Sequence, residues 1–146
     1  MPRAGIRILV GIDFSRESIA ALRAARALAK KTGGRVTIAH VRPSSDLRAA
    51  VMEDRGDLLR GKRDLSATLE DHYARRLARK CRPASGERIL VLRGNPGEAL
   101  CRTASRGYDL LAVGTRGRGG VAAFLLGSTV QEILVKSRIP VMVVRR

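Results

Sequence analysis

Residues 113–129 read V-G-T-R-G-R-G-G-V-A-A-F-L-L-G-S-T, and this stretch decides how the surrounding chain folds. An apolar run, residues 110–113, precedes it, and a run with helical spacing, residues 130–136, follows it. The stretch is therefore expected to connect a strand to a helix. Three of its glycines and a serine fit the pattern G-x2-G-x9-G-[ST]: Gly114, Gly117, Gly127 and Ser128. Because such a connection exposes backbone N–H groups beside a helix N-terminus, it predicts a site for a nucleotide or another phosphorylated ligand.

Strand and helix patterns alternate along the rest of the chain. Strands are expected at Arg7–Asp13, Val36–Val41, Arg88–Arg93, Leu110–Thr115 and Val141–Arg145. Helices are expected after Ser15 as far as Lys31, at Asp64–Lys80, after Asn95 as far as about Arg106, and at Ser128–Ser137. Residues 44–62 are irregular, and we assign them no element. The alternation predicts one α/β domain over residues 1–146, with a parallel sheet built from right-handed β-α-β units.

The composition limits the class of protein. A chain of 146 residues with 45% hydrophobic residues can bury a core without disulfides or metal. It contains no apolar run as long as a membrane span and begins without a signal-peptide pattern, so a cytoplasmic location is expected. Cys81 and Cys101 are too few and too badly spaced for a metal site. Both fall on apolar helical stripes, which predicts buried, unreactive thiols.

The charge is strongly positive, with 29 Lys and Arg against 13 Asp and Glu, or +16 in total. Such a balance attracts phosphates, nucleic acid and acidic membrane surfaces. Aromatic residues make up only 3% of the chain, whereas readers of single-stranded nucleic acid usually stack bases on aromatic side chains. The charge is therefore interpreted first as arginines spread over solvated helix faces. Docking on nucleic acid or an acidic surface stays open through a basic helix face: Arg75, Arg76, Arg79, Lys80 and Arg82.

Ligands of parallel sheets bind beyond the carboxyl ends of the strands, where the strand order reverses. Three segments follow expected strand ends, namely residues 13–15, 40–42 and 115–129. Their convergence at one edge of the sheet predicts a shared site. His40 ends an apolar strand, and we expect it to be packed and hydrogen-bonded rather than catalytic.

The whole chain resembles the universal stress protein family. The resemblance rests on ILVGIDFSRES at residues 8–18, RGNPGEAL at 93–100, GTRGRGG and LLGST within the glycine loop, and IPVMVVR at 139–145. It implies a Rossmann-like three-layer sandwich whose five-stranded parallel sheet has the order 3-2-1-4-5, flanked by helices. Members that keep the full glycine loop generally bind ATP, and this sequence keeps it, so the resemblance implies the ATP-binding branch.

The same resemblance implies roles for single residues. Asp13 would make polar contacts with the adenosine end of ATP, and the backbone of Val41 would pair with the adenine edge. The loop glycines, Gly114, Gly117 and Gly127, would let the backbone approach ribose and phosphates. Ser128 and Thr129 would donate hydrogen bonds to the phosphates, on which Mg²⁺ could also bind. The family also pairs its last strand with a second copy, which implies a homodimer through Val141–Val144.

Several of these residues have purely structural alternatives. Asp13 could cap the first helix or its turn, and Ser128 with Gln131 forms an S-x-x-Q capping box that needs no ligand. The glycines could form a flexible surface loop. Arg116, like Arg118, could neutralise a triphosphate or contact an RNA backbone. The apolar segment 121–126 is expected to form a short turn packed on the sheet or on a partner.

Three functions are compatible with this sequence. The leading hypothesis is a regulatory or stress-response protein that senses ATP. An enzyme is the second, but the segment after the first strand, G-I-D-F-S, lacks the glycine- and serine-rich loop of ATP-activating relatives. No Asp, Glu or His is evidently placed as a base beside the phosphate loop, so at most weak ATP hydrolysis is expected. Docking through the basic helix face is the third.

Overall fold

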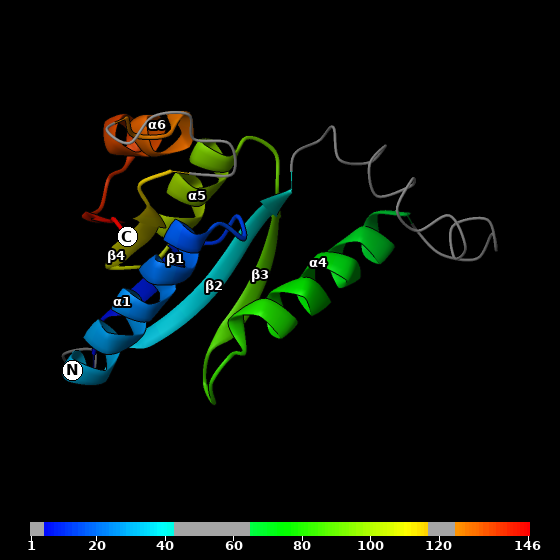
Figure 1. Ribbon diagram of the computed structural model, residues 1–146, viewed down its shortest axis with the longest axis horizontal. Helices are drawn as coiled ribbons and strands as arrows, with labels where there is room; N and C mark the ends of the chain where they lie inside the picture. The colour runs from blue at the N-terminus through cyan, green and yellow to red at the C-terminus, as the bar shows by residue number, and fades with distance from the viewer. Residues whose placement is uncertain (1–4, 43–64, 117–124) are drawn as a thin grey trace.

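The computed structural model describes residues 5–42, 65–116 and 125–146 and contains a single parallel sheet within them. The strands are β1 Arg7–Gly11, β2 Arg35–Arg42, β3 Arg88–Arg93, β4 Leu110–Gly114 and β5 Val141–Val144. The helices are α1 Arg16–Thr32, α4 Leu65–Cys81, α5 Pro96–Ala104 and α6 Ser128–Lys136. The strand order is β3-β2-β1-β4-β5, as expected from the resemblance (Figure 1).

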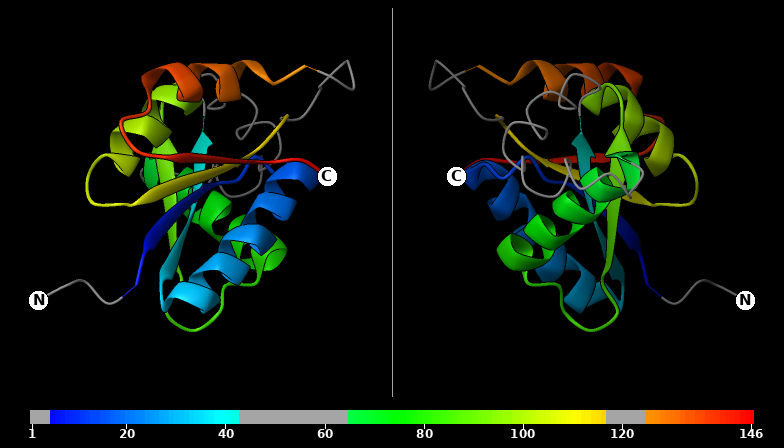
Figure 2. Two further views of the ribbon diagram at one scale, coloured as in Figure 1. Left: turned by 90° about the vertical axis from the view of Figure 1, so that its left-hand side faces the viewer. Right: turned by 90° about the vertical axis from the view of Figure 1, so that its right-hand side faces the viewer.

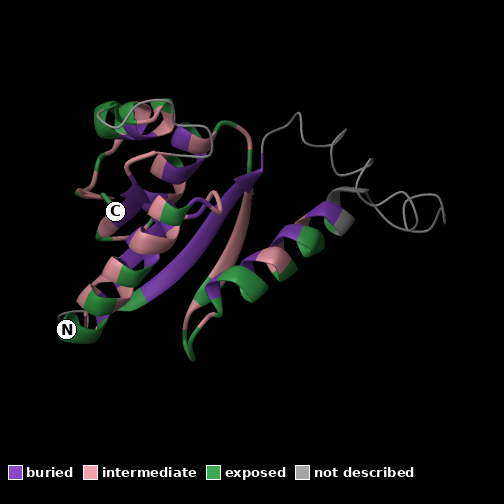
Figure 3. Cartoon of the chain, in the orientation of Figure 1, coloured by how far each residue is buried: buried purple, intermediate pink, exposed green. Residues whose placement is uncertain are grey.

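The helices cover opposite faces of the sheet, which makes three layers (Figure 2). Alternation along β1 sends Ile8 and Val10 into the core beneath α1 and α4, while Leu9 enters the core beneath α5 and α6. The central strands β1 and β2 are buried on both faces, which explains their nearly unbroken apolar sequences (Figure 3). The predicted fold class is therefore confirmed.

Side-chain caps start two helices where the sequence predicts them. The Ser15 hydroxyl accepts a hydrogen bond from the N–H of Ser18 at 3.1 Å and starts α1. The side chain of Asn95 accepts one from the N–H of Glu98 at 3.0 Å and starts α5, with Pro96 in its first turn. Gly33 ends α1 in the left-handed conformation, with φ of 64°.

Several expected boundaries differ from the observed ones. The first strand was expected to reach Asp13 but ends at Gly11, because Asp13 and Ser15 form a turn of their own. The helix expected to reach about Arg106 ends at Ala104, and Thr115 lies outside β4. Residues 44–62, to which the sequence assigned no element, lie outside the described part of the chain. Among the described helices, none combines the length and the apolar content that crossing a membrane requires.

Candidate functional site

The turn between β1 and α1 holds Asp13 in a structural role. Its Oδ1 accepts hydrogen bonds from the backbone N–H of Ser15, at 2.9 Å, and from the Ser15 hydroxyl. Phe14, between them, has a positive φ of 67°, which bends the chain away from the sheet. The capping alternative for Asp13 is thus found. Its Oδ2 accepts no hydrogen bond from the described residues and so remains available to another donor.

The same turn contacts the end of β4. The Ser15 hydroxyl oxygen lies 3.4 Å from the backbone oxygen of Arg116, and a guanidinium nitrogen of Arg116 lies 4.0 Å from a carboxylate oxygen of Glu17. Gly114 is buried against this part of α1, where a Cβ atom would lie 2.6 Å from the carbonyl carbon of Glu17. The packing of α1 therefore explains this glycine without a ligand, and its predicted role in ligand approach stays a prediction.

The first turn of α6 presents free backbone donors. Gly127 is the N-cap, in an extended conformation, and its carbonyl accepts the first helical hydrogen bond from the N–H of Gln131 at 3.0 Å. Ser128 and Thr129 are therefore the first two residues of the helix. Their N–H groups donate to no acceptor among the described residues, as expected for an uncapped helix start. These donors, with the positive end of the helix dipole, suit an anion.

The capping box proposed for Ser128 and Gln131 is wrong. It requires Ser128 at the N-cap, whereas the structure has Gly127 there and no side-chain cap. The Gln131 side chain instead donates to the carbonyl of Leu126 at 2.8 Å. The Ser128 side chain is therefore not engaged in a cap, and a ligand can use its hydroxyl.

One backbone hydrogen bond holds the start of α6 beside the end of β4, and a second joins the end of β4 to β5. The N–H of Gly127 donates to the carbonyl of Thr115 at 2.9 Å, and the N–H of Thr115 donates to the carbonyl of Val144 at 2.9 Å. The two ends of the glycine-rich connection thus meet although its middle, with Gly117, Arg118 and residues 121–124, lies outside the described residues. Leu125 is 67% exposed, so the expected packing of the apolar segment on the sheet is not found for this residue.

The backbone of Val41 lies just beyond the last bond between β1 and β2. In a parallel pair the N–H and C=O groups of every second residue of a strand point to the same neighbouring strand. The carbonyl of Ala39 points toward the β1 side, since it accepts a hydrogen bond from the N–H of Ile12 at 2.7 Å. The N–H and C=O of Val41 therefore also point toward the β1 side. Continued pairing would bond the N–H of Val41 to the carbonyl of Ile12, but no such bond exists in the described residues.

His40 explains why the pairing stops there. Its Nδ1 lies 2.7 Å from the carbonyl oxygen of Ile12 and donates to it, so this nitrogen carries the proton. The imidazole thus takes the acceptor that Val41 would otherwise use. His40 is buried, and its ring packs between Phe14 and Tyr73, with centroids 4.8 Å from each. The expectation of a packed, hydrogen-bonded histidine is confirmed.

Sequence reasoning missed the aromatic cluster around His40. Phe14 and Tyr73 come from the turn after β1 and from α4, and the guanidinium of Arg76 lies 4.1 Å from the centroid of the Phe14 ring. The sequence alone places Arg76 only on the basic helix face considered for docking. The sole sequence signal was the position of Phe14 directly after a strand end, which does not indicate its partners.

The described residues thus bring most of the predicted site together at the carboxyl edge of the sheet. The turn at Asp13, the end of β4 with Gly114 and Arg116, and the start of α6 at Gly127 are joined by the contacts above. Val41 is the last residue but one of the neighbouring strand, β2. An exposed helix start, a carboxylate oxygen and an unpaired strand segment could together hold a ligand with an anionic end and a flat, hydrogen-bonding end.

Comparisons with known proteins agree with the sequence resemblance. The universal stress protein family matches residues 6–145 of the chain. A protein of Thermus aquaticus, named "Universal stress protein in QAH/OAS sulfhydrylase 3'region", is 40% identical over 60 residues, or 40% of this chain and 44% of that protein. The match therefore spans less than half the length of that relative.

Solved structures resemble the fold over nearly the whole chain. The universal stress protein UspA from Lactobacillus plantarum is 21% identical and has a TM-score of 0.67, covering 96% of this chain and 97% of that one. A universal stress protein in complex with cAMP is 22% identical and has a TM-score of 0.63, covering 97% of this chain and 98% of that one. At these identities the likeness shows the same fold.

Proposed function

The chain belongs to the universal stress protein family, and we propose that it is a regulatory protein that binds ATP at the carboxyl edge of its sheet. The observation that carries the proposal is the uncapped start of α6, held beside β4 by the hydrogen bond from Gly127 to Thr115. The phosphates would bind there, on the N–H groups and hydroxyls of Ser128 and Thr129, with Mg²⁺ held through the phosphates. A structural neighbour in complex with cAMP supports a nucleotide as the ligand class.

The adenosine end would lie toward β1 and β2. Adenine presents a donor and an acceptor along one edge, and the backbone of Val41 offers the complementary pair on the side where β1 has ended. The Oδ2 of Asp13 is available to the ribose or to the amino group of the base. Gly114 and Gly127 would contribute close backbone approach, as would Gly117 if the loop folds over the phosphates. The backbone of Arg116 would contact the Ser15 hydroxyl and so help to position the turn after β1. The positive charge of its guanidinium group would attract the phosphates.

The expected affinity is micromolar. Hydrogen bonds to a charged group contribute about 1.5–3 kcal/mol each, and the dipole of a helix adds about 0.3–1 kcal/mol. Three or four such bonds, with burial of the base, leave roughly 8 kcal/mol after the cost of association, which corresponds to about 1 μM. The sequence places no evident base beside the glycine-rich connection, so we propose sensing rather than turnover, with hydrolysis well below about 1 s⁻¹.

The experiment is a calorimetric titration of nucleotide-stripped protein with ATP and Mg²⁺, with GTP and cAMP as competitors. Gly127→Val adds a branched side chain where the phosphates would approach, and φ of −61° with ψ of 153° accommodates valine, so this variant should fold. We expect it to lose ATP binding, while Arg102→Ala, on the exposed face of α5, keeps it. Unchanged ATP affinity in folded Gly127→Val would overturn the site.

The docking alternative has less support than ATP binding. Two side chains of its basic face are engaged within the chain, because Arg75 pairs with Asp71 and Arg76 stacks on Phe14.

A second copy of the chain, by contrast, has a specific surface to which it can bind. β5 is an edge strand, and we propose that Val141–Val144 pairs with the same strand of a partner, in a protein located in the cytoplasm.

A further inference from the structure

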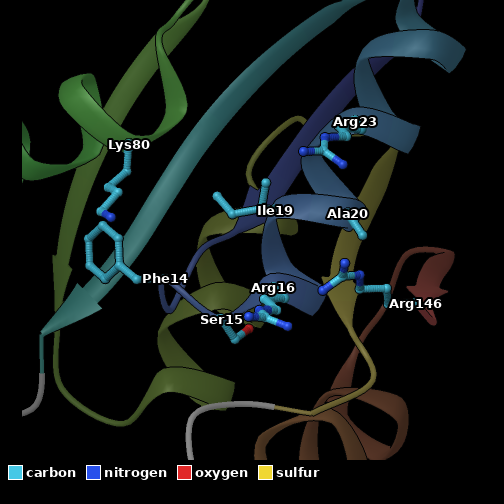
Figure 4. Close-up of a pocket in the computed structure, with 8 residues that line it drawn as sticks. All are labelled: Phe14, Ser15, Arg16, Ile19, Ala20, Arg23, Lys80 and Arg146. Atoms are coloured by element: carbon cyan, nitrogen blue, oxygen red, sulfur yellow. The ribbon is translucent and has the colours of Figure 1, made fainter.

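A cationic cavity adjoins the site described above through Phe14 and Ser15, and extends over the face of α1 that points away from the sheet. Its volume is about 460 Å³, within the range of small-molecule sites. None of the residues assigned to the ATP site lines it. Its basic residues come from three segments far apart in the sequence: Arg16 and Arg23 from α1, Lys80 from the last turn of α4, and Arg146 after β5 (Figure 4).

Part of the cavity lining is apolar and consists of Phe14, Ile19 and Ala20. Arg16, Ile19, Ala20 and Arg23 occupy one face of α1 because residues three and four apart on a helix are neighbours. Figure 4 shows Ile19 between the ring of Phe14 on one side and the arginine side chains on the other. The cavity therefore combines a small hydrophobic surface with a ring of positive charge.

The positive charge of the cavity is not neutralised by the described residues. No acidic side chain lines the cavity, and its four basic side chains form no ion pair or hydrogen bond with the described part of the chain. The acidic side chains nearest in sequence, Asp13 and Glu17, are not among the residues that line the cavity, and Glu17 lies beside Arg116. The four basic side chains repel one another, the α-carboxylate of Arg146 offsets one of their charges, and a bound anion would relieve the remaining repulsion.

We propose that this cavity binds a small organic polyphosphate, with its phosphates on Arg16, Arg23, Lys80 and Arg146 and its organic part on Ile19 and Ala20. A ligand with two or more linked phosphates offers several anionic groups to the four basic side chains that line the cavity. A nucleic acid strand is less well suited, because the site is a concave cavity of limited volume rather than an extended basic track.

The test uses inorganic tripolyphosphate as the probe and calorimetry as the measurement. It is performed on Gly127→Val, so that the start of α6 does not contribute. We expect one site per chain and an affinity that falls at least about tenfold when Arg23→Ala and Lys80→Ala are added together. The matched control, Lys31→Ala with Arg102→Ala, removes the same charge from exposed helix positions outside the cavity and should weaken binding less than about threefold.

Four results would overturn the proposal. The first is that the wild-type protein does not bind tripolyphosphate. The second is that the wild-type protein binds tripolyphosphate but the single variant Gly127→Val does not, which would assign the binding to the start of α6. Equal effects of the two double substitutions would show attraction to the net charge only. Tighter binding of a short single-stranded RNA than of tripolyphosphate, lost in the Arg23→Ala, Lys80→Ala protein, would assign the cavity to nucleic acid instead.

Discussion

Gly114 at the end of β4 packs against the backbone of Glu17 in the first turn of α1, so closely that a Cβ atom on Gly114 would lie 2.6 Å from the Glu17 carbonyl carbon. The same added atom would lie 2.7 Å from the backbone nitrogen of Ser18. This contact fixes the height at which α1 starts above the sheet. It therefore also fixes the turn at Asp13, on which the proposed nucleotide site depends.

Gly114→Ala is expected to destabilise the protein by about 2–3 kcal/mol, because backbone atoms cannot move aside without shifting α1. Gly11→Ala is the control, since its Cβ would meet the side chain of Leu100, 2.8 Å away, which can change rotamer. We expect Gly11→Ala to cost about 1 kcal/mol or less. Urea unfolding of both variants measures the difference, and equal losses would contradict the close contact with α1.

The ion pair of Arg26 with Glu87 should make stability depend on pH. Two nitrogens of Arg26 donate to the carboxylate at 2.8 and 2.7 Å, and the side chain of Glu87 is only 9% exposed. Burial by itself would raise the pKa of Glu87. The hydrogen bonds from Arg26 and the N–H of Ala84, with the charge of Arg26, outweigh burial and hold this pKa below its usual value.

A carboxyl whose pKa is lower in the folded protein adds stability above its unfolded pKa, near 4.3, and loses it as the pH falls through the folded value. Glu87→Gln should therefore cost about 1–3 kcal/mol at pH 7 and progressively less below about pH 4. Asp71→Asn, in the exposed pair with Arg75, should cost less than about 0.5 kcal/mol. Chemical unfolding from pH 3 to 7 tests both; a pH-independent cost for Glu87→Gln would contradict the linkage.

His40 should keep the Val41 amide out of the sheet. Because His40 takes the Ile12 carbonyl, the N–H of Val41 is predicted to exchange with solvent faster than that of Ala39, which lies within the β1–β2 ladder. His40→Leu frees the Ile12 carbonyl to accept from the N–H of Val41, so the Val41 amide should exchange more slowly with solvent. ATP affinity should then fall about fivefold or more, because the N–H of Val41 would no longer be available for one hydrogen bond to the base. Amide exchange by NMR and calorimetry measure the two effects. Fast exchange at Val41 together with unchanged affinity in His40→Leu would contradict this role, and His72→Leu, on an exposed position, is the control.

The sequence predicted most of the fold but only part of the site, for physical reasons. Periodicity and capping depend on neighbours in the chain, so the strands, α1 after Ser15 and α5 after Asn95 could be read directly. The N-cap of α6 could not, because Gly127 and Ser128 are both acceptable caps and a tertiary bond to Thr115 decides between them.

The contacts of His40 and Gly114 also lie beyond sequence reasoning. Gly114 belongs to a glycine pattern that indicates ligand approach, yet its neighbour is Glu17, almost a hundred positions away in the chain. His40 bonds to Ile12, the residue directly after the adjacent strand, which requires the register of β1 and β2 to be known. Pairs of this kind are set by the packed fold and carry no local signal.

The two cysteines are expected to react slowly. Burial raises the pKa of both the Cys81 and the Cys101 thiols, so both are protonated at neutral pH. Cys81 is 4% exposed and should be modified more slowly than the half-buried Cys101. Iodoacetamide labelling followed by mass spectrometry measures the order, and the rates should become equal in urea. Labelling of Cys81 as fast in the native protein as in urea would be inconsistent with its burial.

The edge strand β5 supports a last prediction, that the protein is a dimer held by backbone pairing. Met142 and Val144 direct their backbone groups to β4, as the bond from Thr115 to Val144 indicates, so the N–H and C=O of Val143 point outward. Val143→Pro removes only this outward N–H and leaves the β4 pairing intact. We expect sedimentation to show a dimer for the wild type and for Val143→Thr, which keeps the N–H, but a folded monomer for Val143→Pro. A Val143→Pro protein that remains dimeric would contradict β5 as the interface, because proline at this position removes an outward donor in the middle of the proposed pairing.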